Sequence, residues 1–354
     1  MSNYIEYRDE VAFHPGYYIK EIVEESGLTQ EDFAKRLGTT PKNLSVLIKG
    51  DQSLSIDIAT KLSRMLGTTI VYWLNLQQIY DEKLALIQSE EELVRERDVF
   101  RLIEYRYFSD HFSLPELPRQ TDERIKCVRE FLHISSLTVL EEENLSVRFR
   151  SYSEELSRSN IVNANVMVQI AVNRTLKQAA PKYNKKKFEK AVSYALTQTG
   201  NHEGFIKAVT SAFADAGVVL VALPNLKNSG VNGASKKVDG KIMLMVNDRR
   251  HYEDTFWFTM FHEIGHILNG DLGISLKDEK EDEADLYARN ALIPPEEYER
   301  FVRRNQRFDE VSIRRFAEDI GRDPGIVLGR LMMDQKEPHT AMNLSEKLRH
   351  GFYL

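Results

Sequence analysis

Two histidines that stand four residues apart on an apolar helix constrain this chain more than any other feature of its sequence. The segment 255–268 contains His262, Glu263 and His266 in the pattern His-Glu-x-x-His. Residues four apart on a helix lie one above the other, so the two imidazoles face the same way and can bind one metal ion. The glutamate between them is then placed to act on water as a general base. The pattern predicts a zinc hydrolase with His262 and His266 as metal ligands and Glu263 as the catalytic residue.

The sequence on both sides of the motif fits a folded site. Residues 241–246 before it are typical of a short buried strand. Gly270 after it predicts the end of the helix, because glycine adopts the left-handed conformation that closes helices. The alternative is a buried helix with two hydrogen-bonded histidines and no metal. That arrangement is costly for two histidines and a glutamate on an apolar helix.

A catalytic zinc ion usually has three protein ligands, so a third ligand is expected elsewhere in the chain. Residues 278–295 begin with an acidic run and continue as a helix whose small side chains share one face. Glu283 falls beside that face and is the predicted third ligand, with Glu279 one turn earlier as the alternative. Asp282 and Asp285 are expected to point away or to support a ligand from behind. The remaining carboxylates suit a solvated helix start.

These stretches resemble the ImmA/IrrE metallopeptidases, in which the His-Glu-x-x-His helix is followed by the pattern Glu-Ala-Asp/Asn-x-Phe/Tyr-Ala-x-x-Leu-x-Pro. Residues 257–268 and 283–294 match these two patterns, and residues 216–224 look like the first strand of the family. The resemblance implies a zincin-like α+β domain with Zn²⁺ as its cofactor and Glu283 as the third ligand. It also implies an endopeptidase whose substrate is a repressor-like protein.

A second pattern, near the start of the chain, is that of a helix-turn-helix. Thr29 is predicted to cap a short helix that ends at Gly38, and Thr40 to cap a second helix that Pro41 opens. The outward face of the second helix carries lysine, asparagine and serine, which suit the major groove of DNA. The residues expected to contact DNA are Thr29, Gln30, Lys42, Asn43, Ser45 and Lys49.

The charge of this region weighs against strong DNA binding. Residues 1–80 carry eight basic and ten acidic side chains, whereas DNA-binding domains are more often basic. The helix-turn-helix itself is locally basic through Lys35, Arg36, Lys42 and Lys49, which predicts modest and salt-sensitive affinity. The alternative is a helical interaction module that has the fold and does not bind DNA.

Residues 14–16, His-Pro-Gly, and residues 72–81 frame this region. With them it resembles the HigA/VapI branch of the Cro/repressor-like helix-turn-helix domains. The resemblance implies operator DNA as a partner, binding as a homodimer, and a toxin as a protein partner.

Length and composition predict two domains joined by helices, because 354 residues exceed a single core. We expect a mainly α protein with a small β-sheet in its C-terminal part. The expected parts are an all-α, five-helix helix-turn-helix domain over residues 1–81, a helical connecting region over 82–210, and an α+β metallopeptidase domain over 211–354. Separate helices are expected over residues 71–77 and 84–107. Residues 311–331 are expected to pack against the peptidase domain.

Cellular location is also predicted from composition. Hydrophobic residues make up 42% of the chain and charged residues 29%. No apolar run approaches the roughly 18 residues of a membrane helix, and the first ten residues are polar and acidic. The single cysteine, Cys127, leaves no partner for a disulfide within these residues. These points predict a cytoplasmic protein with no membrane partner.

Three functions fit these patterns. The first is a transcriptional regulator whose peptidase domain cleaves a repressor or another partner protein. The second is a HigA-like antitoxin in which the metallopeptidase domain is a non-catalytic scaffold for a toxin. The third is an autoprotease that cuts its own linker near residues 113–119. The intact set of His262, Glu263 and His266 favours catalysis, because a scaffold has no need of the glutamate.

Overall fold

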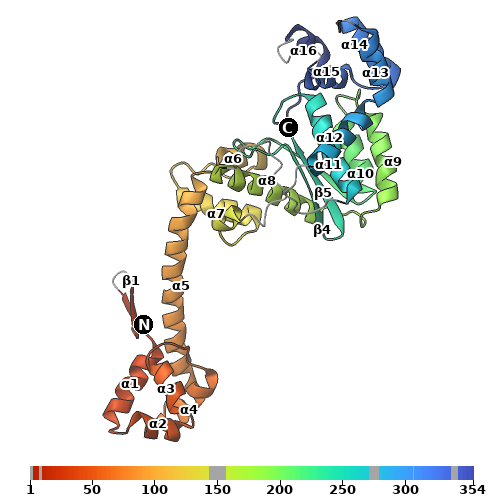
Figure 1. Ribbon diagram of the computed structural model, residues 1–354. Helices are drawn as coiled ribbons and strands as arrows, with labels where there is room; N and C mark the ends of the chain where they lie inside the picture. Colours follow the sequence, from red (N-terminus) through yellow and green to blue (C-terminus); the bar gives the residue numbers. More distant parts are fainter. Residues whose placement is uncertain (1–2, 8–9, 143–156, 271–278, 306, 336–341) are drawn as a thin grey trace. The chain divides into compact units, whose positions relative to one another are not determined.

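The structure is a computed structural model (Figure 1) that describes residues 3–7, 10–142, 157–270, 279–305, 307–335 and 342–354. The side chains of residues 279–282 and 342 are outside this description. By its internal packing the chain divides into two compact units, Met1–Arg95 and Glu96–Leu354. One helix, α5, spans the division. The sheet and the helices from α6 onward belong to the second unit, while the boundaries expected after residues 81 and 210 stay predictions.

The first unit is helical apart from one β-hairpin. Strands β1 and β2 pair antiparallel, with Tyr4 opposite Phe13. Only helices were expected here, so the hairpin is an addition. Helix α5 joins the helix expected over residues 71–77 to most of that expected over 84–107, but it ends at Phe100. The elements of this unit are β1 (Tyr4–Tyr7), β2 (Glu10–Phe13), α1 (Pro15–Glu25), α2 (Gln30–Leu37), α3 (Pro41–Ile48), α4 (Ile56–Leu66) and α5 (Ile70–Phe100).

The start of α1 gives a physical reason for the sequence His14-Pro15-Gly16. The Nδ1 atom of the buried His14 accepts a hydrogen bond from the Gly16 backbone N–H at 2.9 Å and so caps the helix. Burial lowers the pKa of His14, which keeps the ring neutral and able to accept this bond. A Cβ atom on Gly16 would lie 2.0 Å from the carbonyl oxygen of Leu47 in α3. The close contact of α1 with α3 therefore requires glycine.

The helix-turn-helix has the predicted caps. The side chain of Thr29 accepts a hydrogen bond from the Asp32 backbone N–H, and α2 ends at Gly38 with φ at 71°. The side chain of Thr40 accepts a hydrogen bond from the Asn43 backbone N–H at 3.1 Å, and Pro41 begins α3. The core that holds these helices together includes Ile19, Phe33, Leu44, Leu62 and Trp73.

The second unit is built around a three-stranded sheet in the order β3-β5-β4, with β3 parallel and β4 antiparallel to β5. The sequence identified β5 almost to its ends. The helices before the sheet are α6 (Arg106–Phe112), α7 (Thr121–Leu132), the 3₁₀ helix η1 (Leu137–Glu141), α8 (Arg158–Lys177), α9 (Lys185–Leu196) and α10 (Phe205–Ala214). The strands and later helices are β3 (Val218–Leu223), β4 (Gly233–Val238), β5 (Lys241–Asn247), α11 (Glu253–Asn269), α12 (Glu279–Leu292), α13 (Pro295–Arg304), α14 (Glu310–Ile320), α15 (Pro324–Met333) and α16 (Met342–Leu348).

Helices cover both faces of this sheet, so every residue of β5 is buried. Ile242, Leu244 and Val246 face the core that α11 shares with α10. Helix α8 packs against all three strands, and α11 packs against β4 and β5 (Figure 1). Helix α15 packs against α11, as the sequence analysis expected of residues 311–331. Strand β4 is left at an edge of the sheet, beside α11.

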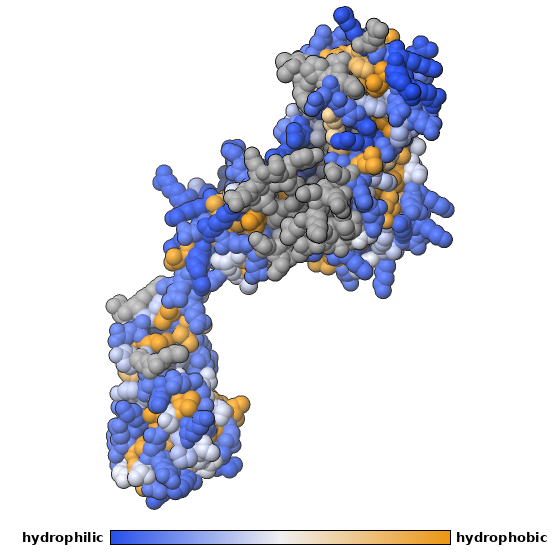
Figure 2. Space-filling view, in the orientation of Figure 1, coloured by the Kyte–Doolittle hydropathy of each residue, from blue (hydrophilic) through white to orange (hydrophobic). Residues whose placement is uncertain are grey.

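The surface visible in Figure 2 is mostly hydrophilic in both units, with hydrophobic side chains scattered over it. Within the described residues, none of the helices combines the length and the apolar character that crossing a membrane requires.

We expect Gly16→Ala to destabilise the first unit by about 1–3 kcal/mol, because the new methyl group forces α1 away from Leu47. The measurement is hydrogen exchange of residues 15–66 in the full chain. Gly200→Ala is the control, since nothing lies within 4 Å of a Cβ atom there. Unchanged exchange in the Gly16 variant would contradict the close contact of α1 with α3.

Candidate metal centre and nucleic-acid interface

Helix α11 holds the His-Glu-x-x-His motif because one of its faces is anchored in the core. Phe256, Trp257 and Phe261 are almost fully buried in that core. The helix ends at Gly270, whose φ of 76° is in the left-handed region, as the sequence predicted. His262 is partly exposed, whereas Glu263 and His266 are buried. The motif thus presents its polar groups from a fixed helix.

The two histidines converge on one point. Their Nε2 atoms lie 3.2 Å apart. Two imidazole nitrogens bound to one tetrahedral zinc ion at about 2.0–2.1 Å are separated by about 3.3 Å. The Nδ1 atom of His262 lies 2.7 Å from Oδ1 of Asp285 in α12. A carboxylate accepts the Nδ1 hydrogen and so leaves the lone pair of Nε2 toward the metal position. The donor set fits a zinc ion.

Glu263 is held from the edge strand. Its Oε2 atom accepts a hydrogen bond of 2.9 Å from the Ser235 hydroxyl in β4. At Gly233 in the same strand, a Cβ atom would lie 2.9 Å from Cγ of Glu263 and equally close to a methyl group of Thr259. Glycine therefore allows β4 to lie directly against the glutamate. The carboxylate has a defined orientation beside the histidine pair.

Helix α12 reaches this site through close packing with α11. Ala284 and Ala288 are fully buried. A Cβ atom on Gly265 would lie 3.3 Å from the Cα atom of Ala284 and 3.2 Å from the Tyr287 ring. Both alanines belong to the face of small side chains that was expected for this helix. The contact fixes the rotation of α12 and turns Asp285 toward His262.

Glu283 stays the predicted third ligand, and the structure describes only its surroundings. Glu283 is exposed, and among the residues that the structure describes it does not join the two histidines in a cluster of ligand atoms. Glu283 and Asp285 are two positions apart, which is about 200° around a helix, so they cannot face the same side. The sequence interpretation correctly allowed Asp285 a supporting role. The alternative ligand, Glu279, has its side chain outside the described residues.

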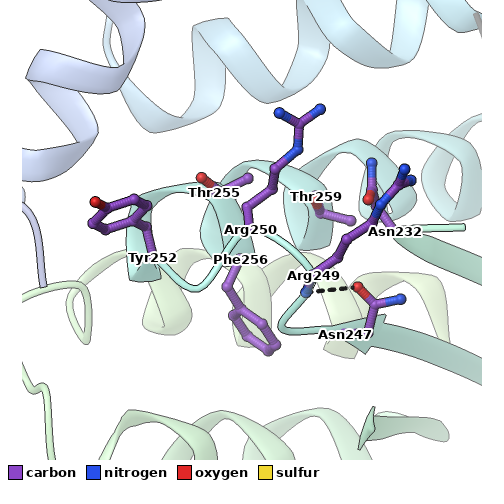
Figure 3. Close-up of a pocket in the computed structure, with 8 residues that line it drawn as sticks. All are labelled: Asn232, Asn247, Arg249, Arg250, Tyr252, Thr255, Phe256 and Thr259. Carbon is purple, nitrogen blue, oxygen red and sulfur yellow. Dashed lines mark hydrogen bonds between the residues drawn. The ribbon is translucent and has the colours of Figure 1, made fainter. Parts of the chain in front are cut away.

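A shallow pocket lies along the first turns of α11 (Figure 3). Figure 3 shows Arg249 and Arg250 rising from the loop between β5 and α11, near Thr255 and Thr259 of the helix. Arg249 is fixed by a 3.0 Å hydrogen bond to the Gly230 carbonyl oxygen. The pocket is lined by Asn232, Asn247, Arg249, Arg250, Tyr252, Thr255, Phe256 and Thr259. Because Thr259 is one turn before Glu263, the pocket adjoins the motif. Sequence reasoning did not find it, since its residues come from separate segments.

The predicted DNA contacts are on α2 and α3, and the structure separates them into two groups. Thr29, Gln30, Lys42 and Lys49 are exposed, whereas Asn43 and Ser45 are half-buried. The amide of Asn43 donates to the Thr39 hydroxyl at 2.8 Å and accepts from Gln52 at 2.7 Å. The Asn43 side chain therefore holds Thr39, in the turn between α2 and α3, and Gln52, which follows α3.

Two family models match the chain. A helix-turn-helix model matches residues 19–73, and a model of the IrrE N-terminal-like domain matches residues 215–332. The first unit is thus of a transcription-regulator type, and the second contains an IrrE N-terminal-like domain of a peptidase family. The chain belongs to the proteins that join an N-terminal helix-turn-helix domain of the HigA/VapI type to a C-terminal ImmA/IrrE-type domain.

Two relatives match parts of this chain. The virulence-associated protein I of Dichelobacter nodosus is 32% identical over 75 residues, which is 21% of this chain and 69% of that protein. The HTH-type transcriptional regulator YddM of Escherichia coli K12 is 33% identical over 88 residues, 25% of this chain and 85% of YddM.

Two solved structures also match part of this chain. One is described as an antidote protein of a plasmid maintenance system from Nostoc punctiforme, 34% identical, with a TM-score of 0.23 over 24% of this chain and 92% of that one. The other is a HigA-family addiction module antidote from Coxiella burnetii, 31% identical, with a TM-score of 0.22 over 23% and 91%.

We expect Asp285→Ala to weaken zinc binding about 10–100-fold, because His262 loses the carboxylate that orients its ring. Glu283→Ala is the matched control on the same helix and is expected to bind zinc like the wild type, since its side chain faces solvent. Competition of each variant with a chromogenic chelator measures the affinity. A larger loss in the Glu283 variant would identify Glu283 as the ligand.

Proposed function

We propose that this protein is a DNA-binding regulator whose C-terminal domain is a zinc-dependent endopeptidase that cleaves a repressor-like or other partner protein. The observation that carries the proposal is the pair of Nε2 atoms 3.2 Å apart, with the buried carboxylate of Glu263 on the intervening turn. Two convergent imidazoles beside a fixed general base are the set of groups that hydrolysis of a peptide bond needs.

His262 and His266 would hold the zinc ion, and a carboxylate from the start of α12 would complete the set. We assign this role to Glu281 from its position in the sequence. Glu281 stands four residues before Asp285, and residues four apart on a helix share a face. Asp285 already faces His262. Glu283, which is exposed, and Glu279 are the alternatives against which this assignment is tested.

In the proposed reaction, bound zinc would polarise the scissile carbonyl group and acidify a water molecule. Glu263 accepts the proton of that water as it attacks the carbonyl carbon, and then donates it to the leaving amine. The hydrogen bond from Ser235 to Oε2 fixes the orientation of the Glu263 carboxylate for this transfer. Gly233 keeps β4 close enough to hold that geometry.

The surroundings of Glu263 suit a peptide in extended conformation. Strand β4 is at the edge of the sheet next to α11, so a substrate segment can pair with its outer side through backbone hydrogen bonds. The pocket beside it carries the exposed Arg249 and Arg250 (Figure 3). We therefore expect substrates with an acidic side chain near the cleaved bond.

A second candidate function is a HigA-like antitoxin that binds operator DNA and a toxin, with the metallopeptidase domain as a non-catalytic scaffold. It is favoured by the antidote proteins among the relatives of the first unit. The hydrogen bond that orients Glu263 favours catalysis instead, because a scaffold gains nothing from a positioned base. In a variant of the peptidase hypothesis, the substrate is the chain's own linker near residues 113–119.

We expect Glu263→Gln to keep the zinc content of the wild-type chain and to lower peptide hydrolysis about 10²–10⁴-fold, because only the proton acceptor is lost. Glu281→Ala should bind about one zinc ion fewer than the wild type and lose hydrolysis, and Glu279→Ala should match the wild type in both. Elemental analysis measures the metal, and mass spectrometry of a peptide library incubated with each variant measures cleavage. Equal cleavage by the wild type and the Glu263 variant would show that Glu263 is not the catalytic base. The scaffold function would then be favoured.

For the first unit we propose binding of operator DNA through α3. Lys42 and Lys49 are exposed near opposite ends of this helix. Both are placed to contact phosphates, which contribute affinity and salt dependence rather than sequence reading. Asn43 would act by fixing the turn.

We also propose that DNA is bound by a homodimer. Helix α5 exposes three large apolar side chains, Tyr72, Ile79 and Leu86, at seven-residue spacing. This spacing is that of one seam position of a coiled coil, so a second copy of α5 is the partner that fits it.

We expect Lys42→Ala and Lys49→Ala each to weaken DNA binding and to reduce the salt slope of the affinity by about one. The probe is a duplex that the wild-type chain selects from a random library. Lys20→Ala on α1 is a control of equal charge change. If all three variants lose affinity equally, the effect is one of net charge, and α3 is not the contact surface.

A further inference from the structure

A second group of potential metal ligands lies in the same unit, outside the His-Glu-x-x-His motif. His202, Asp323 and His350 each offer one ligand atom, and these atoms all lie within 4.8 Å of one another. His202 precedes α10, Asp323 caps the start of α15, and His350 follows α16. Sequence reasoning missed the group, because the nearest two members are 27 positions apart in the chain.

The distances in this group are close to those of a metal site. The Oδ2 atom of Asp323 lies 3.6 Å from Nε2 of His202 and 3.9 Å from Nε2 of His350. Ligand atoms around a tetrahedral zinc ion are separated by about 3.3 Å, given bonds of about 2.0–2.1 Å. The two imidazole rings are stacked, with centroids 3.7 Å apart. His350 is half-exposed, so its ring can turn out of the stack and direct Nε2 toward the ion.

Two members of the group, the half-buried His202 and the buried Asp323, are each oriented by a second contact. The Nδ1 atom of His202 lies 2.7 Å from Oε2 of Glu253, the first residue of α11. A carboxylate accepts the Nδ1 hydrogen, so the lone pair of Nε2 faces Asp323. Asp323 uses Oδ1 to accept the Gly325 backbone N–H at 2.7 Å. Its other oxygen, Oδ2, is the one directed at the two histidines.

The electrostatics of the group favour a cation. Asp323 is 5% exposed, and burial raises the pKa of its carboxyl group. The described ion pairs of Asp323 are with His202 and His350, whereas the nearby Arg349 pairs in bidentate fashion with Asp254. A divalent ion would compensate the buried carboxylate and satisfy both rings.

We propose that His202, Asp323 and His350 form a second metal site, which takes a zinc ion or a similar transition metal with water at the fourth position. Imidazole with one carboxylate is a donor set that such ions prefer. Glu253 serves as the carboxylate behind His202. The site is independent of the proposed peptidase function and uses none of its residues.

The ion would tie the C-terminal segment to the start of α11. The backbone around His350 is already docked there, since the Glu253 N–H donates to the His350 carbonyl oxygen at 3.0 Å and Tyr252 pairs with Gly351. The Arg349 guanidinium lies 3.8 Å from the centre of the Tyr252 ring, and Tyr252 lines the pocket of Figure 3. Metal at this site would therefore stabilise one wall of the pocket.

The test uses the full chain with His262→Ala and His266→Ala, which removes the motif ligands. This variant should still bind about one zinc ion after equilibrium dialysis, and further substitution by His202→Ala or His350→Ala should abolish that binding. Asp323→Asn keeps the helix cap and should lower affinity at least about tenfold, because the anionic ligand is lost. His251→Asn is the control, since His251 is a neighbouring ring outside the group whose positive φ asparagine tolerates.

Hydrogen exchange gives a second measurement on the same variants. Zinc should slow exchange of residues 349–354 in the His262→Ala, His266→Ala chain and leave it unchanged once His350 is also replaced. Absence of zinc in the motif-deficient chain, or zinc that survives loss of His202 and His350, would overturn the proposal. If the motif site does not bind zinc, the result is different. His350→Ala then removes the zinc that the wild-type chain binds, whereas His262→Ala leaves it in place.

Discussion

The close approach of α11 and α12 at Gly265 and Ala284 is the contact on which the candidate site depends. Only residues with almost no side chain let two helices come this near, and the contact leaves α12 a single rotation. That rotation turns Asp285 to His262 and carries Glu283 to solvent. A bulkier residue at either position would separate the helices and release the ring of His262. The chemistry of the histidine pair thus rests on a packing contact that contains no polar atom.

Sequence predicted those parts of the fold that are encoded locally. The caps at Thr29 and Thr40, the helix stops at Gly38 and Gly270, and the buried strand β5 follow from residues adjacent in the chain. Helix boundaries were less predictable. The helix expected over residues 71–77 and most of that expected over 84–107 are joined in α5, because nothing in the polar stretch between them interrupts a helix.

The details of the site depended on information that sequence carries weakly. Glu283 and Asp285 are two positions apart in the chain. Which of the two faces His262 depends on the rotation of α12, which the contact with Gly265 sets. The pocket of Figure 3 and the group of His202, Asp323 and His350 combine segments that are distant in the chain. Their residues carry no pattern in sequence. They become recognisable only when distances between side chains are known.

The cap of α1 has a consequence for the response of the first unit to acid. His14 is the only histidine among residues 1–95, and its pKa in the folded chain is lowered by burial. The unfolded chain therefore binds a proton more readily than the folded one as the pH falls through the ordinary value of about 6.5. Protonation also removes the lone pair that accepts the Gly16 N–H. Mild acidification should loosen α1 from α3, so the helix-turn-helix unit carries its own sensitivity to pH.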